Sequence, residues 1–289
     1  MPASGEHGVI RVDGDTKVLG VIGWPVAHSL SPAIHNAAFR ALGMHRVYVP
    51  LPVRPDGLPH AVQGLLALGF EGANVTMPHK DQSADLADRS SEDARLLHAV
   101  NTFVIEGGEV VGENTDRPGF ERFLRLDAGF EATGCEALIL GAGGAARAVA
   151  LSLARSGASR ITIAVRELDR ATAAVELVRG LGVEAESIGF QSAQGRAADL
   201  VVNATPLGSD GRSMPPLPAL GAGVMVVDLL YHPPQTPWRQ AAERGGARTF
   251  GGLGLLLHQA AVSFERWTGV EAPMDVMSAA AVHALAGRA

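Results

Sequence analysis

Residues 136–157, EALILGAGGAARAVALSLARSG, predict a strand, a glycine-rich turn and a helix in immediate succession. The apolar run EALIL is typical of a strand that is buried on both faces. Gly141 permits a tight turn, Gly143 lets the backbone approach a pyrophosphate, and Ala146 stands where the fingerprint accepts alanine. The start of the helix offers amide hydrogens and a partial positive charge to phosphates. The stretch therefore predicts a dinucleotide-binding domain, the alternative being a turn whose glycines serve packing alone.

The next predicted strand, RITIAV at 160–165, indicates which nicotinamide nucleotide is bound. An acidic residue at its end would accept hydrogen bonds from the ribose hydroxyls of NAD, whereas an arginine would pair with the 2′-phosphate of NADP. Arg166 ends the strand and Arg170 follows, with Glu167 between them. We expect NADP(H); two solvated surface arginines are the alternative. The candidate cofactor-binding residues of this region are Gly141, Ala142, Gly143, Gly144, Ala145, Arg166 and Arg170.

Strand and helix patterns alternate along most of the chain, which predicts mainly parallel sheets and an α/β fold. The strand pattern KVLGVIG, residues 17–23, precedes the helix pattern SPAIHNAAFRALGM, where we expect Ser31 as the N-cap and Pro32 at the first helical position. A second strand–helix series begins near Pro118, and the block from about residue 253 shows helix patterns only. The length of the chain favours two domains.

The composition argues against several classes of protein. With 289 residues, 47% of them hydrophobic, the chain can bury substantial cores. Its net charge of −6 leaves no basic excess to meet phosphates, so a nucleic-acid binder is not expected. Cys135 is the one cysteine and the histidines lack metal-ligand spacing, so neither a disulfide nor a metal site is expected. Without a signal-peptide pattern or a membrane-length apolar run, we expect a soluble cytoplasmic protein, and the sequence leaves a homodimer open.

Residues 72–80, GANVTMPHK, place polar side chains at the end of a predicted strand. Asn74 and Thr76 alternate with apolar residues, so both should leave the same side of the strand. Pro78 cannot continue a central strand, so Lys80 should lie where the chain turns off the sheet. An amide, a hydroxyl and an ammonium thus meet at one strand end, although Lys80 taken alone is typical of a surface lysine.

Six stretches occur in order along the chain: GWPVAHSLSPAIHNAAF, GANVTMPHK, AVNT, GENTDRPGF, GAGGAARA and GLGLLLHQAAVSFERWTG. Together they resemble the shikimate dehydrogenase family, whose members reduce 3-dehydroshikimate to shikimate with NADPH in aromatic amino acid biosynthesis. The resemblance extends over residues 18 to 270. It implies a substrate-binding catalytic domain formed by residues 17–117 and completed by residues 253–289. It also implies an NADP-binding Rossmann domain at residues 118–252, with closure of the two domains excluding water.

The resemblance also implies roles for individual residues. Lys80 and Asp116 would be the catalytic pair, because hydride transfer to a ketone builds negative charge on oxygen that a cationic acid can stabilise and protonate. Which of the two carries the proton stays open. The implied substrate-binding residues are Ser29 and Ser31 at the carboxylate, and Asn74, Thr76, Asn101, Thr115, Tyr231 and Gln259 at or near the hydroxyls. The implied cofactor set is completed by Thr205 and Gly252, with Gly254 beside the nicotinamide.

Three departures and three rival functions belong beside this resemblance. His98 stands where the family usually has glycine, Leu255 where methionine is typical, and Val165-Arg166-Glu167 where Asn-Arg-Thr is common. One rival is an NAD-dependent quinate/shikimate dehydrogenase, and another is a non-catalytic ligand-binding paralogue. Methylenetetrahydrofolate dehydrogenase shares the two-domain plan but lacks the SLSP and NTD stretches. The serine and asparagine pairs could also be ordinary turn and cap residues.

Overall fold

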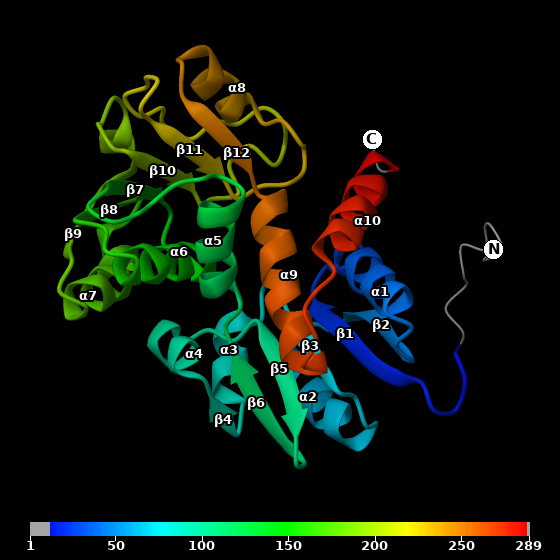
Figure 1. The fold of residues 1–289 in the computed structure, drawn as a ribbon. Helices are drawn as coiled ribbons and strands as arrows, with labels where there is room; N and C mark the ends of the chain where they lie inside the picture. Colours follow the sequence, from blue (N-terminus) through cyan, green and yellow to red (C-terminus); the bar gives the residue numbers. More distant parts are fainter. Residues whose placement is uncertain (1–11, 288–289) are drawn as a thin grey trace. The chain divides into compact units, whose positions relative to one another are not determined.

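The computed structural model describes residues 12–287, which form two compact units (Figure 1). The first unit contains the described residues up to Thr115 and those from Ala260 onwards, and the second is Asp116–Gln259. The resemblance implied domain limits between residues 117 and 118 and between residues 252 and 253. The first limit between the compact units falls at the start of α5 (Asp116–Leu126), which belongs wholly to the second unit, and the other falls inside α9 (Leu253–Thr268). The ranges assigned to substrate and nucleotide stay predictions.

A mixed sheet in the order β2-β1-β3-β5-β6-β4 forms the centre of the first unit. β1 is parallel to β2 and β3, whereas β5 is antiparallel to β3 and β6. β5 and β6 form a hairpin that turns at Gly107 and Gly108, whose φ angles are +61° and +85°. The strands are β1 (Lys17–Gly23), β2 (Arg46–Pro52), β3 (Gly72–Val75), β4 (Arg89–Ser90), β5 (Thr102–Glu106) and β6 (Glu109–Glu113).

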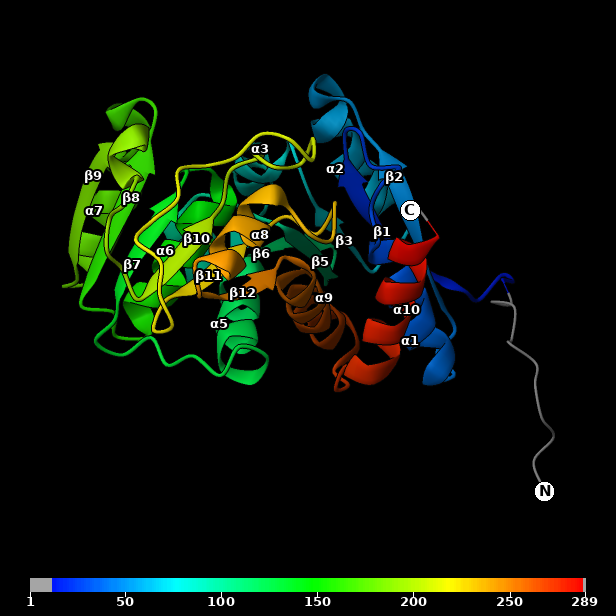
Figure 2. The same ribbon diagram turned by 90° about the horizontal axis from the view of Figure 1, so that it is seen from above.

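Helices cover both faces of this sheet. Ala73 and Val75 of β3 pack in the same cluster as Val62 of α2 and Ala94 of α4. Because side chains alternate along a strand, Asn74 lies on the other face, where α1, α10 and the second half of α9 pack. Figures 1 and 2 show α10 beside α1. The helices are α1 (Ser31–Ala41), α2 (Leu58–Ala67), α3 (Lys80–Asp85), α4 (Glu92–Leu97) and α10 (Met274–Ala286), with the 3-10 turn η1 (Pro55–Gly57).

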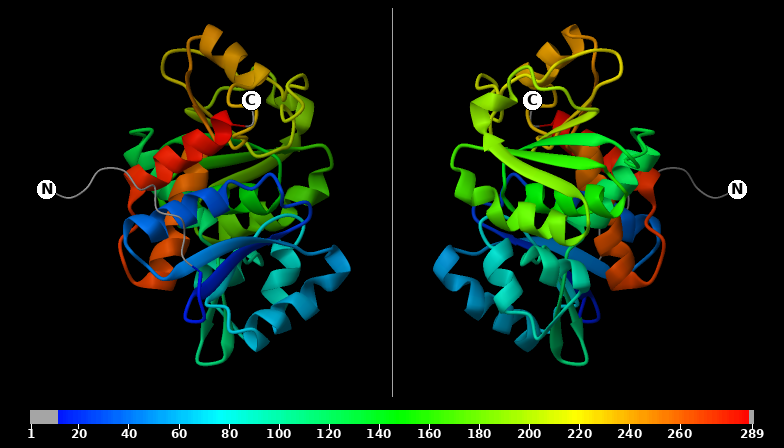
Figure 3. Two further views of the ribbon diagram at one scale, coloured as in Figure 1. Left: turned by 90° about the vertical axis from the view of Figure 1, so that its right-hand side faces the viewer. Right: turned by 90° about the vertical axis from the view of Figure 1, so that its left-hand side faces the viewer.

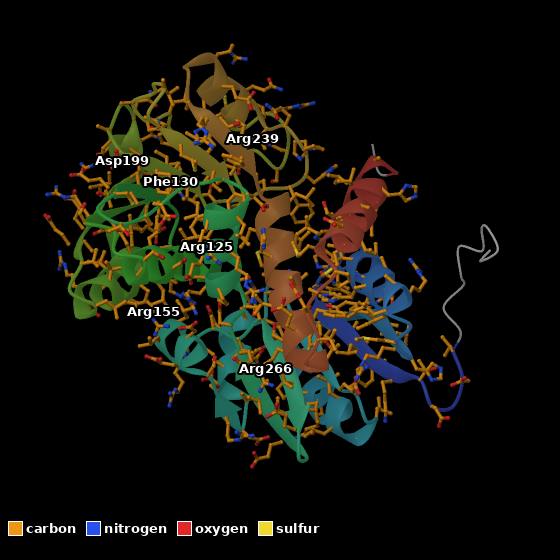
Figure 4. The ribbon with its side chains drawn as sticks, in the orientation of Figure 1. Arg125, Phe130, Arg155, Asp199, Arg239 and Arg266 are labelled. Carbon is orange, nitrogen blue, oxygen red and sulfur yellow. The ribbon has the colours of Figure 1, made fainter. Side chains whose placement is uncertain are left out.

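The last turns of α9 are tied to the sheet by two kinds of contact. Trp267 donates its indole hydrogen to the carbonyl of Phe103 at 2.9 Å, and a Cβ at Gly72 would collide with that indole nitrogen. Arg266, labelled in Figure 4, pairs with Glu106 at 2.7 Å and Glu113 at 3.0 Å. These contacts fix the position of α9 over β3, β5 and β6.

The second unit is a parallel sheet in the order β12-β11-β10-β7-β8-β9. In chain order this is the 6-5-4-1-2-3 arrangement of a dinucleotide-binding fold, so the predicted Rossmann domain is confirmed. Figure 3 shows the sheet in its right-hand view. The strands are β7 (Glu136–Leu140), β8 (Arg160–Val165), β9 (Glu184–Gly189), β10 (Leu200–Asn203), β11 (Met225–Asp228) and β12 (Arg248–Gly251).

Buried residues of α5, α6 and α7 cover one face of the parallel sheet, and Trp238 and Ala242 of α8 cover the other. This two-sided burial explains the continuous apolar runs of β7, β10 and β11. The helices are α6 (Gly144–Arg155), α7 (Thr172–Gly180) and α8 (Pro237–Arg244), with the 3-10 turns η2 (Leu168–Ala171) and η3 (Phe190–Ala193). Within residues 12–287, no helix combines the length and apolar character needed to cross a bilayer.

The expected cap of α1 was wrong. Ser31 is the first helical residue rather than the N-cap, Leu30 occupies the cap position, and no side chain caps the helix there. The hydroxyl of Ser29 instead accepts the backbone hydrogen of Ser31 at 3.2 Å. An upstream serine therefore satisfies a backbone donor of this first turn, and the side chain of Ser31 is not used for capping.

Candidate functional site

The glycine turn after β7 lies at the switch point of the parallel sheet, between β7 and β10. Gly141 has a φ of +105°, and a Cβ there would lie 3.1 Å from both the Ala204 carbonyl oxygen and Thr205 Cγ2. Glycine is therefore required at this position for two reasons: its φ angle is positive, and a side chain would be crowded by the loop at Ala204 and Thr205. The structure thus brings together two predicted cofactor residues, Gly141 and Thr205. Ligands of open α/β sheets bind at this point.

The helix end behind the turn is open to a ligand. α6 begins at Gly144, and Gly143 is its exposed N-cap residue with an extended backbone. A Cβ at Gly143 would meet no described atom within 4 Å. Space on this side of the backbone, together with the free amide hydrogens of a helix N-terminus, fits a pyrophosphate.

A buried polar network holds the Thr205 loop. Asn203, the last residue of β10, accepts hydrogen bonds from the backbone nitrogen of Thr205 at 3.0 Å and from its hydroxyl at 2.7 Å. Its amide nitrogen donates to Asp228 Oδ1 at 3.0 Å, and Thr236 donates to Asp228 Oδ2 at 2.7 Å. Burial raises the pKa of Asp228, although hydrogen bonds from Thr236, Leu230 and Asn203 act in the lowering direction. Asp228 therefore joins the loops that follow β10 and β11.

The loop after β11 leads to Tyr231 and lies against Gly252. The backbone nitrogen of Gly252 donates to the carbonyl of Leu230 at 2.9 Å, and a Cβ at Gly252 would collide with the carbonyl oxygen of Leu229. Tyr231 itself is partly exposed. A predicted cofactor residue and a predicted substrate residue thus belong to segments that touch.

Helices α5 and α9 approach closely where two further predicted residues lie. A Cβ at Gly119 would be 2.7 Å from the backbone nitrogen of Gln259, and a Cβ at Gly254 would be 2.5 Å from Phe123 Cδ2. Asp116 is on the same face of α5 as Gly119, one turn earlier. The structure therefore brings Gln259 to the first turn of α5, whose first residue is Asp116.

The arginines predicted to bind the 2′-phosphate are exposed at the end of β8. Arg170 Nε lies 3.1 Å from Glu167 Oε2, in an ion pair whose side chains are both 68% exposed. A pair this exposed contributes little to stability and can exchange partners. Arg170 can thus exchange Glu167 for a phosphate, and the binding of the 2′-phosphate by Arg166 and Arg170 stays a prediction.

In the first unit, several predicted substrate residues meet in one buried cluster of hydroxyls and amides. The amide nitrogen of Asn74 donates to Thr102 Oγ1 and to Ser263 Oγ, each at 2.9 Å. Asn101 Oδ1 accepts from the backbone nitrogen of Thr115 at 2.8 Å and from its hydroxyl at 3.2 Å. Asn74, Asn101 and Thr115 are therefore brought together, with Thr102 and Ser263 joining them.

Two aromatic side chains support this cluster: Tyr48 from β2 and His35 from α1. The hydroxyl of Tyr48 donates to Asn74 Oδ1 at 2.6 Å and also contacts the side chain of Ser31. His35 stacks on Tyr48 with ring centroids 4.4 Å apart. Desolvation lowers the pKa of His35 to about 3, against a raising effect of the neighbouring Asn74 side chain, so the ring is neutral. Ser31 is thereby connected to Asn74 through Tyr48.

The turn that carries Lys80 is anchored on both sides. The backbone nitrogen of His79 donates to the carbonyl of Thr76 at 3.0 Å, and the buried His79 ring contacts the Val53 carbonyl at 2.8 Å. Lys80 is the first residue of α3, and its carbonyl accepts the backbone hydrogen of Val100 at 3.0 Å. Thr76 lies just past the strand. The backbone hydrogen bond of Lys80 places it next to Val100, which directly precedes Asn101. The pairing of Lys80 with Asp116 stays a prediction.

Sequence reasoning did not assign Tyr48, Thr102, Ser263, Asn203 and Asp228. Asn203 and Asp228 could have been found, because each is a polar residue that ends a buried apolar strand at the ligand-binding edge of a parallel sheet. Ser263 lies four residues after Gln259, which places the two on one face of a helix. Tyr48 gives no such signal.

Comparison with known families matches three regions of the chain. Residues 21–103 match the shikimate dehydrogenase substrate binding domain, and residues 252–282 match the shikimate 5′-dehydrogenase C-terminal domain. Residues 137–245, which contain the glycine turn, match the saccharopine dehydrogenase NADP binding domain.

Near-full-length relatives agree with these matches. The chain is 46% identical over 285 residues to shikimate dehydrogenase (NADP(+)) of Methanopyrus kandleri, covering 96% of this chain and 98% of that protein. A crystal structure of a shikimate dehydrogenase in complex with NADP+ matches with a TM-score of 0.89 and 37% identity, covering 97% and 99% of the two chains. Quinate dehydrogenase from Corynebacterium glutamicum in complex with NAD matches with a TM-score of 0.85 and 32% identity, covering 93% and 99%.

Proposed function

Because this chain belongs to the shikimate dehydrogenase family, we propose that it reduces 3-dehydroshikimate to shikimate with NADPH, as an oxidoreductase of the shikimate pathway. The observation that carries the proposal is the 46% identity to an NADP-dependent shikimate dehydrogenase, which extends over 96% of the chain and so includes both units. The same reasoning assigns the substrate to the first unit with its C-terminal helices and the nucleotide to the second.

The residues of the glycine turn fit the nucleotide. Gly141, Gly143 and Gly144 allow the backbone at the N-terminus of α6 to approach the pyrophosphate, and Thr205 lies beside Gly141. Arg166 would contribute its guanidinium to the 2′-phosphate. When bound, NADPH supplies the hydride.

The chain's own residues handle the substrate and its proton. Lys80 would stabilise the negative charge that develops on the ketone oxygen and then protonate that oxygen, with Asp116 orienting it. Ser29 and Ser31 would hold the carboxylate. The ring hydroxyls would be held by Asn74, Thr76, Asn101 and Gln259, with Thr115 and Tyr231 nearby.

A steady-state assay of shikimate and quinate oxidation, each with NADP+ and NAD+, tests the proposal. We expect shikimate with NADP+ to give the highest kcat/KM. A higher value for quinate with NAD+ would assign the chain to the function named for the Corynebacterium relative. No turnover of either substrate would favour a ligand-binding paralogue.

A further inference from the structure

Ser263 is a fully buried hydroxyl to which neither the sequence nor the proposed function gives a role. Its Oγ lies 2.9 Å from Asn74 Nδ2, 3.1 Å from Thr102 Oγ1 and 3.2 Å from Thr115 Oγ1. These partners come from β3, from β5 and from the segment after β6. One helical hydroxyl thus joins α9 to three places at one end of the central strands.

The hydrogens of this cluster can be assigned from one end. Tyr48 donates its hydroxyl hydrogen to Asn74 Oδ1 at 2.6 Å, so the nitrogen of this amide faces Thr102 and Ser263. Both amide hydrogens of Asn74 are then used within the protein. The hydroxyls of Thr102 and Ser263 accept from Asn74 and must give their own hydrogens elsewhere.

The Thr102 hydrogen goes to Asn101, which also accepts two hydrogens from Thr115. Asn101 Oδ1 accepts from the Thr102 hydroxyl at 3.1 Å, from the Thr115 hydroxyl at 3.2 Å and from the Thr115 backbone at 2.8 Å. Since an amide carries its oxygen and nitrogen on opposite sides, this fixes the rotation of the Asn101 side chain and turns its nitrogen away from the cluster. The side of Asn101 that faces away from the cluster therefore carries the donor end of its amide.

We propose, resting on the function proposed above, that Ser263 is a positioning residue for recognition of the substrate's ring hydroxyls. By holding Asn74, Thr102 and Thr115 in register, it keeps Asn101 oriented as a hydrogen-bond donor to a hydroxyl oxygen. Asn74 then serves mainly to organise the site, and a ligand can reach it only through the second lone pair of Oδ1, which also accepts from Tyr48.

The geometry differs from that of a hydroxyl buried for packing alone. On the same helix, Thr268 donates to the carbonyl of Phe264 four residues earlier, at 2.7 Å, which satisfies a hydroxyl without any other element. Among the described residues, the buried Ser152 of α6 has no hydrogen-bond partner for its hydroxyl. Ser263 reaches side chains of other elements, which lie up to 189 residues away along the chain.

The test compares Ser263→Ala with Ser263→Thr, which keeps the hydroxyl, and with Ser152→Ala as a matched buried-serine control. KM and kcat are measured for shikimate and for NADP+, with thermal unfolding in parallel. We expect Ser263→Ala to raise the KM for shikimate about tenfold, because an organised hydrogen bond is lost. The KM for NADP+ should stay within about twofold of the wild type, and the threonine variant should recover most of the loss.

An unchanged shikimate KM in Ser263→Ala, or an equal rise in both KM values, would overturn the positioning role. Thr102→Val tests the same cluster by an isosteric change if Ser263→Ala does not fold, and should give the same selective rise. In the double variant the two effects should be less than multiplicative, and independent effects would contradict the proposal. A wild-type protein that does not oxidise shikimate would refute the proposed function itself, whereas a fully active wild type with an indifferent Ser263 would refute only the positioning role.

Discussion

Replacing Asp228 by asparagine should loosen the two loops at the nucleotide end of the second unit. Asp228 is fully buried and accepts three hydrogen bonds, from Thr236 at 2.7 Å, Asn203 at 3.0 Å and Leu230 at 3.2 Å. In Asp228→Asn the new amide nitrogen must face Thr236, because on the other side it would oppose two donors. The loss of one charge-assisted bond should cost about 2 kcal/mol of unfolding free energy. For a chain of this size, that lowers Tm by roughly 4–8 °C.

The same substitution should change how stability depends on pH. Burial raises the pKa of Asp228 above the ordinary aspartate value. Between the ordinary and the raised pKa, the folded state binds more protons than the unfolded state, so the free energy of unfolding falls as pH rises. Asp228→Asn has no titrating group there, so this part of the slope should disappear.

Denaturant unfolding of the wild type and Asp228→Asn across the weakly acidic range measures both effects. Thr236→Ser is the matched control, because it keeps the hydroxyl that donates to Asp228 and accepts from the backbone of Arg239. A variant as stable as the wild type, with an unchanged pH slope, would refute the reasoning about this network.

Three further substitutions test the proposed site. Lys80→Ala should lower kcat at least about 100-fold with little change in the KM for shikimate, since it removes a transition-state interaction; unchanged turnover would contradict the catalytic role. Arg166→Ala should raise the KM for NADPH about tenfold and leave that for NADH nearly unchanged, as steady-state assays with each nucleotide would show; equal losses would place the 2′-phosphate elsewhere. Gly252→Ala should lower Tm by several degrees, because its Cβ collides with the Leu229 carbonyl oxygen; scanning calorimetry showing wild-type stability would contradict that clash.

The sequence was sufficient to predict the strands that are buried on both faces. β7 and β8 were expected from their short apolar runs, and the glycine turn follows β7 as predicted; β10 and β11 are apolar runs of the same kind. β9, EAESIG, and β12, RTFG, were not predicted. Both lie at the edges of the sheet, where one side has no neighbouring strand and polar residues are tolerated. Local pattern therefore identifies central strands and misses short polar edges.

The candidate site was predictable in its residues but not in its connections. Asn74 was singled out because it is polar in an apolar strand, yet its partners lie 26, 28 and 189 residues away, at Tyr48, Thr102 and Ser263. Contacts at such separations follow from the folded topology, and no local periodicity signals them. The first turn of α1 is a different case, because the acceptor there is the hydroxyl of Ser29, only two residues before Ser31, and the serine-proline pattern pointed to Ser31 instead.

The position of the second limit inside α9 has a consequence for synthesis on the ribosome. The second unit is one uninterrupted segment, Asp116–Gln259, whereas the first needs residues from Ala260 onwards to complete its core. Phe264 and Trp267, which pack around His35, are synthesised only after the whole of the second unit. The N-terminal strands are therefore made before the second unit, and during translation the face of their sheet that α1 covers in part is completed only after the second unit has been made.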